Sequence, residues 1–363
     1  MTRILALCSP GEVRVAVVAD GTLLDYAIWR PGRPDGVGDL YRGRVTAHVP
    51  ALAGAFIGLP EDNGFLPDSE GGAGAIEGTL LTVRITRAAQ GGKGPRLSAK
   101  VPHSPGPPGL VARGPGAIEE YAARYPDAPV LADDPALVAL LRPALGDRIT
   151  MARGLLEEEV AGQIEALGAP ELSLPGGMRA TIHPTPALVA IDMDTAAATT
   201  GRQPKGAMQL AANRAALPEL ARQIRLRNLS GAILIDLAGM SPKRRRGLGP
   251  VLSEALAPDP LQPRFLGFTS LGLAEILRAR VHPPLHELLA GPHAAGLLAV
   301  RELAREAATA PHLALRLVAA PDVIESLERD DVALADLARR TGRPLIPVPD
   351  PRLPPCAWRI ARD

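Results

Sequence analysis

Alternating apolar and polar positions predict two paired strands near the start of the chain. The runs Glu12–Ala19 and Thr22–Trp29 alternate in this way and are separated by the dipeptide Asp20-Gly21. An Asp-Gly pair between strand-like runs is typical of a tight hairpin turn, because both residues accept a positive φ. The stretch that follows, Arg30–Gly38, is rich in proline and glycine and indicates a boundary.

Short strand-like runs continue through Asp39–Lys100, separated by glycine, proline, asparagine and aspartate. Four or five short antiparallel strands in a segment of this length predict a small barrel. The individual runs are Leu40–Val49, Gly54–Leu59, Gly64–Leu66 and Thr79–Thr86. A second stretch rich in proline and glycine, Pro102–Pro115, is predicted to be a linker.

Beyond this linker the pattern becomes that of an α/β protein. Two apolar runs, Ala187–Asp192 and Ala232–Asp236, predict buried strands that each end in an acid. The arginine-rich run between them, Ala207–Leu226, predicts a helix, and Pro218 within it predicts a kink or a later start. Further helices are predicted at Ala117–Arg124, Pro135–Leu141, Glu157–Leu167, Gly247–Ala257, Ala274–Arg280, Leu297–Ala308 and Pro321–Arg329.

The composition, 46% hydrophobic and 22% charged among 363 residues, is that of an ordinary globular protein. This length predicts two or three domains with enough core to fold without disulfides or metals. Cys8 and Cys356 stand at opposite ends of the chain without a CxxC motif. This arrangement excludes a cysteine-based zinc site and favours a reducing cytoplasm. No apolar run approaches the length of a membrane span, so we expect a soluble, cytoplasmic protein without a membrane partner.

A formal net charge of +1 hides two segments of opposite charge. Residues 116–171 contain eleven acidic and four basic residues, whereas residues 201–250 contain ten basic and two acidic residues. A basic block in a nearly neutral protein indicates an anionic partner, with RNA or DNA as the first candidates. Taken alone, the block is also compatible with a solvated helix face followed by a basic loop.

Two carboxylates at strand ends favour the functional interpretation. Asp192 and Asp236 each end a predicted strand, where open α/β sheets bind ligands, and Asp194 lies on the same strand face as Asp192. One or two carboxylates completed by water suit Mg²⁺, which activates water and stabilises charge on a phosphate. A single aspartate of this kind more often caps a turn or pairs with an arginine. Two of them flanking a basic block predict a metal site.

Cations close to these acids are candidates for phosphate binding. Arg225 lies on the predicted helix between the two strands, and the run Lys243-Arg244-Arg245-Arg246 follows the second strand directly. Guanidinium groups bind phosphate oxygens in pairs, which suits a site that handles RNA. We select Arg225, Lys243 and Arg244 as the candidates.

The barrel segment contains YRGRV, GAFIGL and NGFLP at the spacing of an S1-type OB-fold, a fold that binds single-stranded nucleic acid. Phe56 and Phe65 lie in two of these motifs, and Lys93 lies in the loop GGKG. As isolated residues the two phenylalanines are equally compatible with ordinary barrel core. The loop lacks the frame of a phosphate-binding P-loop.

Taken in order, these segments resemble the bacterial ribonuclease E/G family almost from end to end. The resemblance implies a multidomain α/β (α+β) fold. Residues 1–36 and 104–174 would form a ribonuclease H-like subdomain, interrupted by an S1-type OB barrel at 37–103. Residues 175–283 would form a deoxyribonuclease I-like catalytic subdomain, and 284–363 a small carboxy-terminal domain. The stretches that carry the resemblance include RVAVVADGTLLDYAIWRPG, LSLPGGMRATIHPTPALVAIDMDTAAATTG, NRAALPELARQIRLRNLSGAILIDLAGM, FTSLGLAEILRAR and GRPLIPVPDPRLPPCAWRI.

The resemblance also implies an activity: Mg²⁺-dependent cleavage of single-stranded RNA, in the processing of ribosomal RNA precursors and the turnover of messages. Asp192 and Asp236 fall on the family's two metal-binding acids, which would hold one Mg²⁺ per active site. Asp194 falls on a catalytic-site position that is commonly asparagine. Phe56 and Phe65 fall on positions that contact RNA.

Lys93 also falls on an RNA-contacting position of the family. The retained carboxy-terminal domain leads us to expect a homodimer.

Two alternatives to the nuclease use the same fold: an RNA-binding protein and a ribosome-assembly factor, each with little or no cleavage. A pure binder gains nothing from two acids that repel phosphate, so the carboxylate pair favours the nuclease.

Four departures from the family pattern distinguish this chain. The cysteine motif of the zinc link is missing, and we expect His282, His286 and His293 in its place to be exposed loop residues, so no zinc is expected. Little sequence remains for the pocket that senses RNA 5′-monophosphates, which predicts weak 5′-end dependence. Gly239 replaces a common acid, and Leu271 replaces a residue that is often polar or basic.

Overall fold

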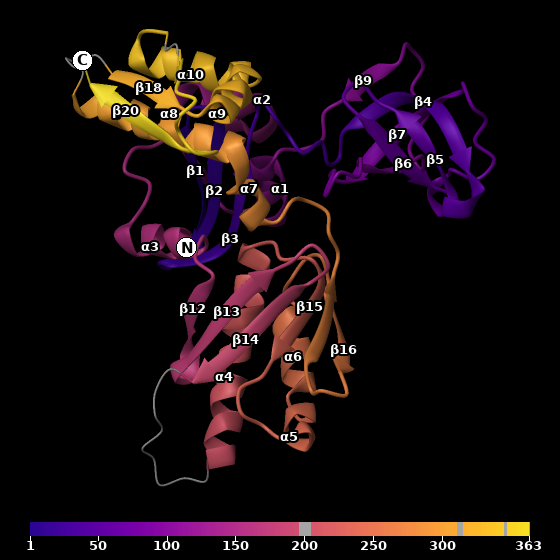
Figure 1. Cartoon of the computed structure of the whole chain (residues 1–363), viewed down its shortest axis with the longest axis vertical. Coiled ribbons are helices and arrows are strands. Elements are labelled where there is room, and N and C mark those ends of the chain that lie inside the picture. The colour runs from indigo at the N-terminus through magenta and orange to yellow at the C-terminus, as the bar shows by residue number, and fades with distance from the viewer. Residues whose placement is uncertain (196–204, 311–314, 345–346, 363) are drawn as a thin grey trace. The chain divides into compact units, whose positions relative to one another are not determined.

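The computed structural model describes residues 1–195, 205–310, 315–344 and 347–362 (Figure 1). The chain forms two compact units, each assembled from segments far apart in the sequence. Unit 1 contains Met1–Pro34, Ala117–Ala169 and Leu285–Asp363, and unit 2 contains Asp35–Gly116 and Pro170–Pro284. The basic residue Arg202 and the end of the stretch IDMDTAAATTG lie outside the described residues. No helix in the described part of the chain is long and apolar enough to cross a membrane.

Unit 1 opens with the predicted hairpin, which is confirmed. Asp20 and Gly21 have φ values of 48° and 75°, as such a turn requires. The hairpin belongs to a five-stranded sheet of order β11-β10-β1-β2-β3, packed on one face against α1 and α2. Its elements are β1 (Thr2–Ser9), β2 (Glu12–Ala19), β3 (Thr22–Trp29), β10 (Val130–Ala132), β11 (Ile149–Met151), α1 (Ala117–Arg124) and α2 (Pro135–Leu145).

The remaining part of unit 1 is a small α/β layer at the end of the chain. Three strands in the order β19-β18-β20 pack against helices α8, α9 and α10 around Leu317 and Val300. The elements of this layer are α8 (Gly291–Thr309), β18 (Leu315–Ala319), α9 (Pro321–Glu328), α10 (Asp331–Thr341), β19 (Val348–Pro349) and β20 (Trp358–Arg362). Two further helices of unit 1, α3 (Glu158–Ala166) and α7 (Leu285–Leu288), contact β3.

Unit 2 contains the expected barrel. Strand β5 pairs with both β6 and β4, and β8 and β7 complete the ring, so five strands close on themselves around Ile57, Leu66 and Leu97. The strands are β4 (Leu40–Val49), β5 (Gly54–Gly58), β6 (Asn63–Pro67), β7 (Leu80–Arg87) and β8 (Arg96–Ser98). The closed barrel confirms the OB-like insertion in a mixed α/β chain. One further strand, β9 (Gly109–Ala112), pairs with β4.

A six-stranded sheet of order β12-β13-β14-β15-β17-β16 forms the other part of unit 2. Helix α4 connects the parallel strands β14 and β15, and α4 and α6 pack together on one face of the sheet (Figure 1). The elements are β12 (Glu171–Leu174), β13 (Met178–Pro184), β14 (Val189–Thr195), α4 (Lys205–Leu226), β15 (Gly231–Asp236), α5 (Pro242–Arg246), α6 (Gly249–Leu256), β16 (Arg264–Phe268) and β17 (Ala274–Arg278). Short 3₁₀ turns occur at Pro50–Leu52, Asp68–Glu70, Gly146–Arg148 and Pro175–Gly177.

Two local predictions are wrong, and one of two alternatives predicted for a helix is excluded. The segment Ala274–Arg280, expected to be a helix, contains strand β17, in which burial alternates with a period of two. The predicted linker Pro102–Pro115 contains β9, whose pairing with β4 satisfies its backbone groups. Helix α4 does not start late but runs through Pro218, because its apolar face is held against the sheet.

Candidate active site

Two of the three candidate aspartates are brought together by strand register. Asp192 on β14 and Asp236 on β15 are direct partners in the parallel pairing of these neighbouring strands. Adjacent strands lie about 4.8 Å apart, and register partners project from the same face, so the two carboxylates are neighbours. Asp194 lies two residues further along β14 and projects from that same face. All three side chains are exposed.

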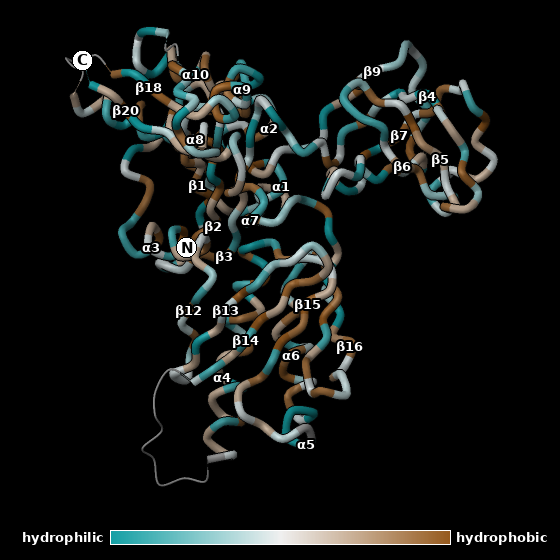
Figure 2. Tube along the Cα trace, viewed as in Figure 1, coloured by the Kyte–Doolittle hydropathy of each residue, from teal (hydrophilic) through white to brown (hydrophobic). Residues whose placement is uncertain are grey.

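Core packing on the opposite face fixes this orientation. Ile191 and Met193 alternate with the aspartates of β14, and Ile233 and Ile235 precede Asp236 on β15; all four are buried in the core shared with α4. Because side chains alternate along a strand, burying these residues turns the acids outward. Figure 2 shows β15 and α6 coloured mostly hydrophobic, whereas α5 is hydrophilic.

One arginine that we did not select contacts the second aspartate. Arg245 on α5 donates from Nη1 to Asp236 Oδ1 and to the carbonyl oxygen of Gly272, both at 2.8 Å, and from Nε to the carbonyl oxygen of Met240 at 3.0 Å. Its side chain is only 14% exposed, whereas that of Asp236 is 51% exposed. Arg245 is one of four consecutive cations, and nothing in the sequence distinguishes it as the one that contacts Asp236 at the end of β15.

The selected cations lie at different places. Lys243 and Arg244 are exposed on α5, and the guanidinium of Arg244 occupies the space that a Cβ at Gly206, in the first turn of α4, would take. Arg225 lies in the last turn of α4, about 30 Å along the helix from Gly206 at 1.5 Å per residue. The structure therefore places Arg244 beside the start of α4 and leaves Arg225 at the other end of this helix.

Side chains of α4 contact the loop that follows Asp236. Asn213, fully buried, donates from Nδ2 to the carbonyl oxygens of Gln209 at 2.7 Å and of Ala238 at 3.2 Å. Gly239 has a φ of 59°, and the side chain of Gln209 occupies the space that a Cβ there would take. The glycine at this position therefore accommodates both the backbone conformation and the close approach of Gln209.

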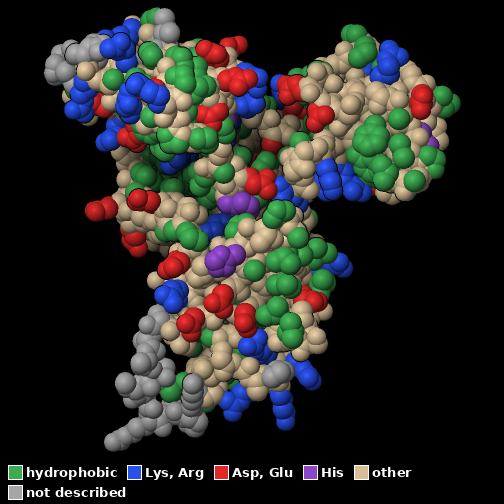
Figure 3. All heavy atoms as spheres, viewed as in Figure 1, with side chains coloured by type: hydrophobic (Ala, Val, Ile, Leu, Met, Phe, Trp, Pro, Cys, Tyr) green, Lys and Arg blue, Asp and Glu red, His purple; other side chains and the backbone are tan. Residues whose placement is uncertain are grey.

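Basic side chains lie near the aspartates, but the described residues do not surround a metal position with protein ligands on all sides. Nη2 of Arg179 on β13 lies 4.0 Å from Oδ2 of Asp194. Figure 3 shows acidic atoms on the strands of this sheet and Lys and Arg atoms around α5. Among the described residues, no three His, Cys, Asp or Glu side chains form a group that could hold a metal ion. Adjacent carboxylates with open coordination positions fit Mg²⁺, which keeps several of its waters.

The barrel presents its two candidate phenylalanines outside its core. Phe56 and Phe65 are register partners with ring centroids 5.6 Å apart, and both alternate with buried core residues. They are therefore not barrel core. The same row continues to Arg96 and then Arg87, which the sequence argument missed, and Lys93 is exposed in the loop before β8. Burial and the neighbouring charge of Arg96 lower the pKa of Arg87.

The three histidines do not all lie in exposed loops. His293 is half-buried in the first turn of α8, where Nε2 lies 2.8 Å from Oδ2 of the buried Asp330. Burial alone would raise the pKa of Asp330, but its hydrogen bonds to His293 and the Ala333 N–H lower it. His282 contacts Asp35 at 2.7 Å, and His286 lies on α7. The expectation of exposed loop histidines is therefore wrong for His293, which is half-buried on a helix, and for His286, which is exposed but lies on α7 rather than in a loop.

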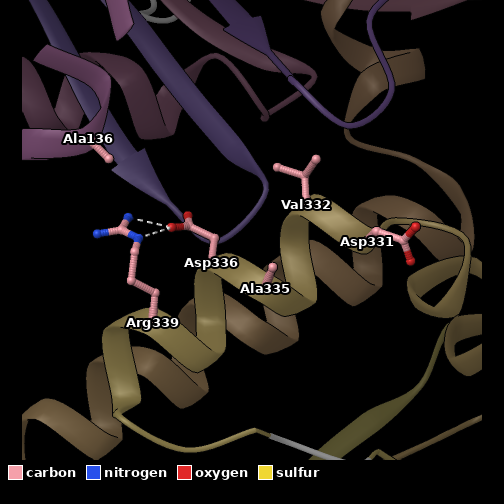
Figure 4. A pocket seen from close by; sticks show the side chains of 6 residues that line it. All are labelled: Ala136, Asp331, Val332, Ala335, Asp336 and Arg339. Atoms are coloured by element: carbon pink, nitrogen blue, oxygen red, sulfur yellow. Dashed lines mark hydrogen bonds and ion pairs between the residues drawn. The ribbon is translucent and has the colours of Figure 1, made fainter. Parts of the chain in front are cut away.

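A hollow of about 410 Å³ in unit 1 carries no candidate chemistry (Figure 4). Two of its three charged lining residues, Arg339 and Asp336, are paired with each other, and Arg339 also contacts Asp134 at 2.5 Å. The remaining walls are mostly small and apolar. The lining residues are Ala136, Asp331, Val332, Ala335, Asp336 and Arg339.

Parts of this chain are similar in sequence to known proteins. Residues 137–281 match the model of the Ribonuclease E/G family. The chain is 24% identical to Ribonuclease E of Haemophilus influenzae and 26% identical to Ribonuclease E of Escherichia coli, in each case over 76% of this chain. These alignments cover 41% and 36% of the two relatives, so the chain spans about two fifths of their length. A shorter stretch, 36% of this chain and 27% of the relative, is 31% identical to Ribonuclease G of Escherichia coli.

Proposed function

We propose that this chain, a relative of the Ribonuclease E/G family, is a Mg²⁺-dependent endoribonuclease that cleaves single-stranded RNA. The observation that carries the proposal is the pairing of Asp192 with Asp236 across neighbouring parallel strands, on an exposed face beside the basic helix α5. Two adjacent carboxylates repel phosphate unless a cation lies between them. A protein that only binds RNA has no use for such a pair.

The residues of this site have separable roles. Asp192 and Asp236 would hold the Mg²⁺, which when bound supplies Lewis-acid stabilisation and a more acidic water. Arg245 donates to Oδ1 of Asp236 at 2.8 Å and would fix the orientation of this carboxylate. Asp194 is exposed on the same face and would accept a hydrogen bond from the attacking water. Lys243 and Arg244 would bind the phosphates that flank the scissile bond.

The barrel would hold the RNA strand. Phe56 and Phe65 provide two half-buried rings for base stacking, which needs no particular base. Arg87, Arg96 and Lys93 lie in or beside the same row of the barrel and would contact the backbone phosphates. Arg225 would contact RNA far from the reacting phosphate.

The wider role follows the same reasoning. We propose ribosomal RNA precursors and messages as substrates, the cytoplasm as location and a homodimer as assembly. We assign residues 1–36 with 104–174, 37–103, 175–283 and 284–363 to the four subdomains named above. The free Cys8 and Cys356 agree with a reducing compartment.

The test is cleavage of an end-labelled, unstructured A/U-rich RNA with Mg²⁺ or EDTA, beside Asp192→Ala and Asp236→Ala. We expect internal cuts that require Mg²⁺ and fall about a thousandfold in each variant, with RNA binding retained. RNA binding without cleavage in the unmutated protein would contradict the nuclease and leave an RNA-binding factor. Co-sedimentation with ribosomal subunits without RNA loss would instead indicate an assembly factor.

A further inference from the structure

A second cluster of charged residues lies in unit 1, around the carboxylate of Glu12, which is only 4% exposed. Arg30 donates to Oε2 from Nε at 3.1 Å and from Nη2 at 2.9 Å. Arg14 donates from Nε to Oε1 at 3.1 Å, and Nη1 of Arg301 lies 3.5 Å from the same oxygen. Three guanidinium groups from β2, the end of β3 and α8 therefore share a single carboxylate.

The cluster has a surplus of two positive charges. The neighbouring acid Glu302 does not balance them, because its Oε2 lies 2.8 Å from Nη2 of Arg305. The side chains of Arg14 and Arg301 are 27% and 25% exposed, so both reach solvent. Burial and the adjacent charge of Arg14 lower the pKa of Arg301, as expected for a cation without its own counter-ion.

A tyrosine hydroxyl lies among the same charged side chains. Tyr26 on β3 is 8% exposed and makes no hydrogen bond within the described part of the chain. Its strand register places it on the sheet face that carries Arg14, and its charged neighbours are Arg14, Glu12, Arg301 and Arg30. Burial raises the pKa of Tyr26 to about 12, so the hydroxyl keeps its proton and can donate. The side chain is buried but the hydroxyl is not among the buried atoms that lack a partner, so it reaches solvent beside the arginines and can donate to a ligand that approaches from there.

We propose that Arg14, Arg301 and Tyr26 form a binding site for a phosphate group, either inorganic phosphate or a phosphate monoester. Guanidinium groups bind phosphate oxygens in pairs, and the hydroxyl supplies a further donor. A phosphate monoester carries close to two negative charges at neutral pH, which matches the surplus of the cluster. Glu12 and Arg30 act as positioning residues, because the carboxylate holds all three guanidinium groups on one face. The site lies in unit 1 and does not depend on the proposed nuclease activity.

The test is isothermal titration calorimetry of the full chain in EDTA, with inorganic phosphate as the probe and sodium chloride of equal ionic strength as the control. EDTA removes metal-dependent binding at the aspartates. We expect one saturable phosphate site, with a Kd raised about tenfold in Arg301→Gln and about threefold or more in Tyr26→Phe. Arg305→Gln is the matched control, because this exposed arginine lies on the same helix and is expected to leave the Kd unchanged.

Adenosine 5′-monophosphate and adenosine separate the two sources of the phosphate group. Tighter binding of the nucleotide than of inorganic phosphate indicates a monoester, and equal binding indicates the free ion. Heat no greater than with sodium chloride, or an unchanged Kd in both variants, overturns the proposal. If Arg301→Gln fails to fold, Tyr26→Phe decides alone, because it removes one oxygen and keeps the packed ring.

Discussion

Arginine and carboxylate side chains meet in both units, but in opposite proportions and at different depths. On the strands β14 and β15, two of three exposed aspartates are each contacted by one arginine: Asp194 by Arg179 and Asp236 by Arg245. In unit 1, three arginines share the one buried carboxylate of Glu12. The same residue types thus produce an excess of exposed carboxylates, which fits a cation, and an excess of partly buried arginines, which fits an anion. Their ratio and burial, not their identity, determine which ligand is favoured.

The largest expected effect is on stability and separates the two regions. Glu12→Gln leaves three partly buried arginines without their shared counter-charge, and we expect it to lower the free energy of unfolding by about 3–5 kcal/mol. Asp236→Asn removes a charge from an exposed pair, so we expect a change of at most about 1 kcal/mol. Urea denaturation of the full chain measures both values.

Cleavage assays on the same two variants complete the comparison. We expect Asp236→Asn to lose cleavage while remaining as stable as the unmutated protein, and the folded fraction of Glu12→Gln to cleave normally. If Glu12→Gln and Asp236→Asn lost equal amounts of stability, burial of the carboxylate would not explain the difference between the arginine cluster and the aspartate pair.

Substitution of Arg245 is expected to have a smaller effect. It tests whether this arginine positions the carboxylate of Asp236 for metal binding. Arg245→Ala frees the carboxylate of Asp236, and we expect a roughly tenfold to hundredfold fall in cleavage at limiting Mg²⁺. Arg245→Lys keeps the charge but not the three hydrogen bonds, so it is expected to restore only part of the activity. The readout is the apparent Mg²⁺ affinity as well as kcat, with the exposed Arg264→Gln as control. A fall in kcat with no change in Mg²⁺ dependence would contradict the positioning role.

The aspartate pair could be found from the sequence, whereas the arginine cluster could not. Asp192 and Asp236 each end an apolar run, so the local pattern alone places both at a sheet edge. Arg301 lies 289 residues from Glu12, and no local signal connects them. Arg245 was overlooked because four consecutive cations look alike until the fold directs one of them inward.

The main error in secondary structure has a similar cause. The segment Ala274–Arg280 is rich in residues that favour helices, such as alanine, leucine and glutamate. Pairing with β15 and β16 on both sides imposes the strand conformation there. The closed barrel, in contrast, was predictable because its turns are marked by glycine, proline and asparagine at regular spacing.

Acidic pH tests how much the charge of Glu12 contributes to the stability of the arginine cluster in unit 1. Burial alone would raise the pKa of Glu12, but its contacts with Arg30 and Arg14 lower it below its ordinary value. A depressed folded pKa stabilises the protein above the unfolded pKa, and the contribution is lost as the pH falls through the folded pKa.

We therefore expect the stability gap between the unmutated protein and Glu12→Gln to narrow as the pH falls from about 5 to about 3. Urea denaturation at each pH measures this gap. Asp330, whose pKa is also lowered, remains in both proteins and cancels in the difference. A gap that stays constant or widens in acid would mean that Glu12 is not ionised in the folded state.

The smallest expected effect belongs to Arg225, at the end of α4 remote from Gly206. A cation that contacts only a distant phosphate adds Coulomb attraction without touching the reacting group, so Arg225→Gln should raise the Kd for RNA by about twofold to threefold and leave kcat unchanged. The slope of log Kd against log salt should fall by about one unit or less. Arg244→Gln, beside the first turn of α4, should lower kcat as well. Equal losses of kcat in the two variants would mean that RNA follows the whole length of the helix, and that position along α4 does not separate binding from catalysis.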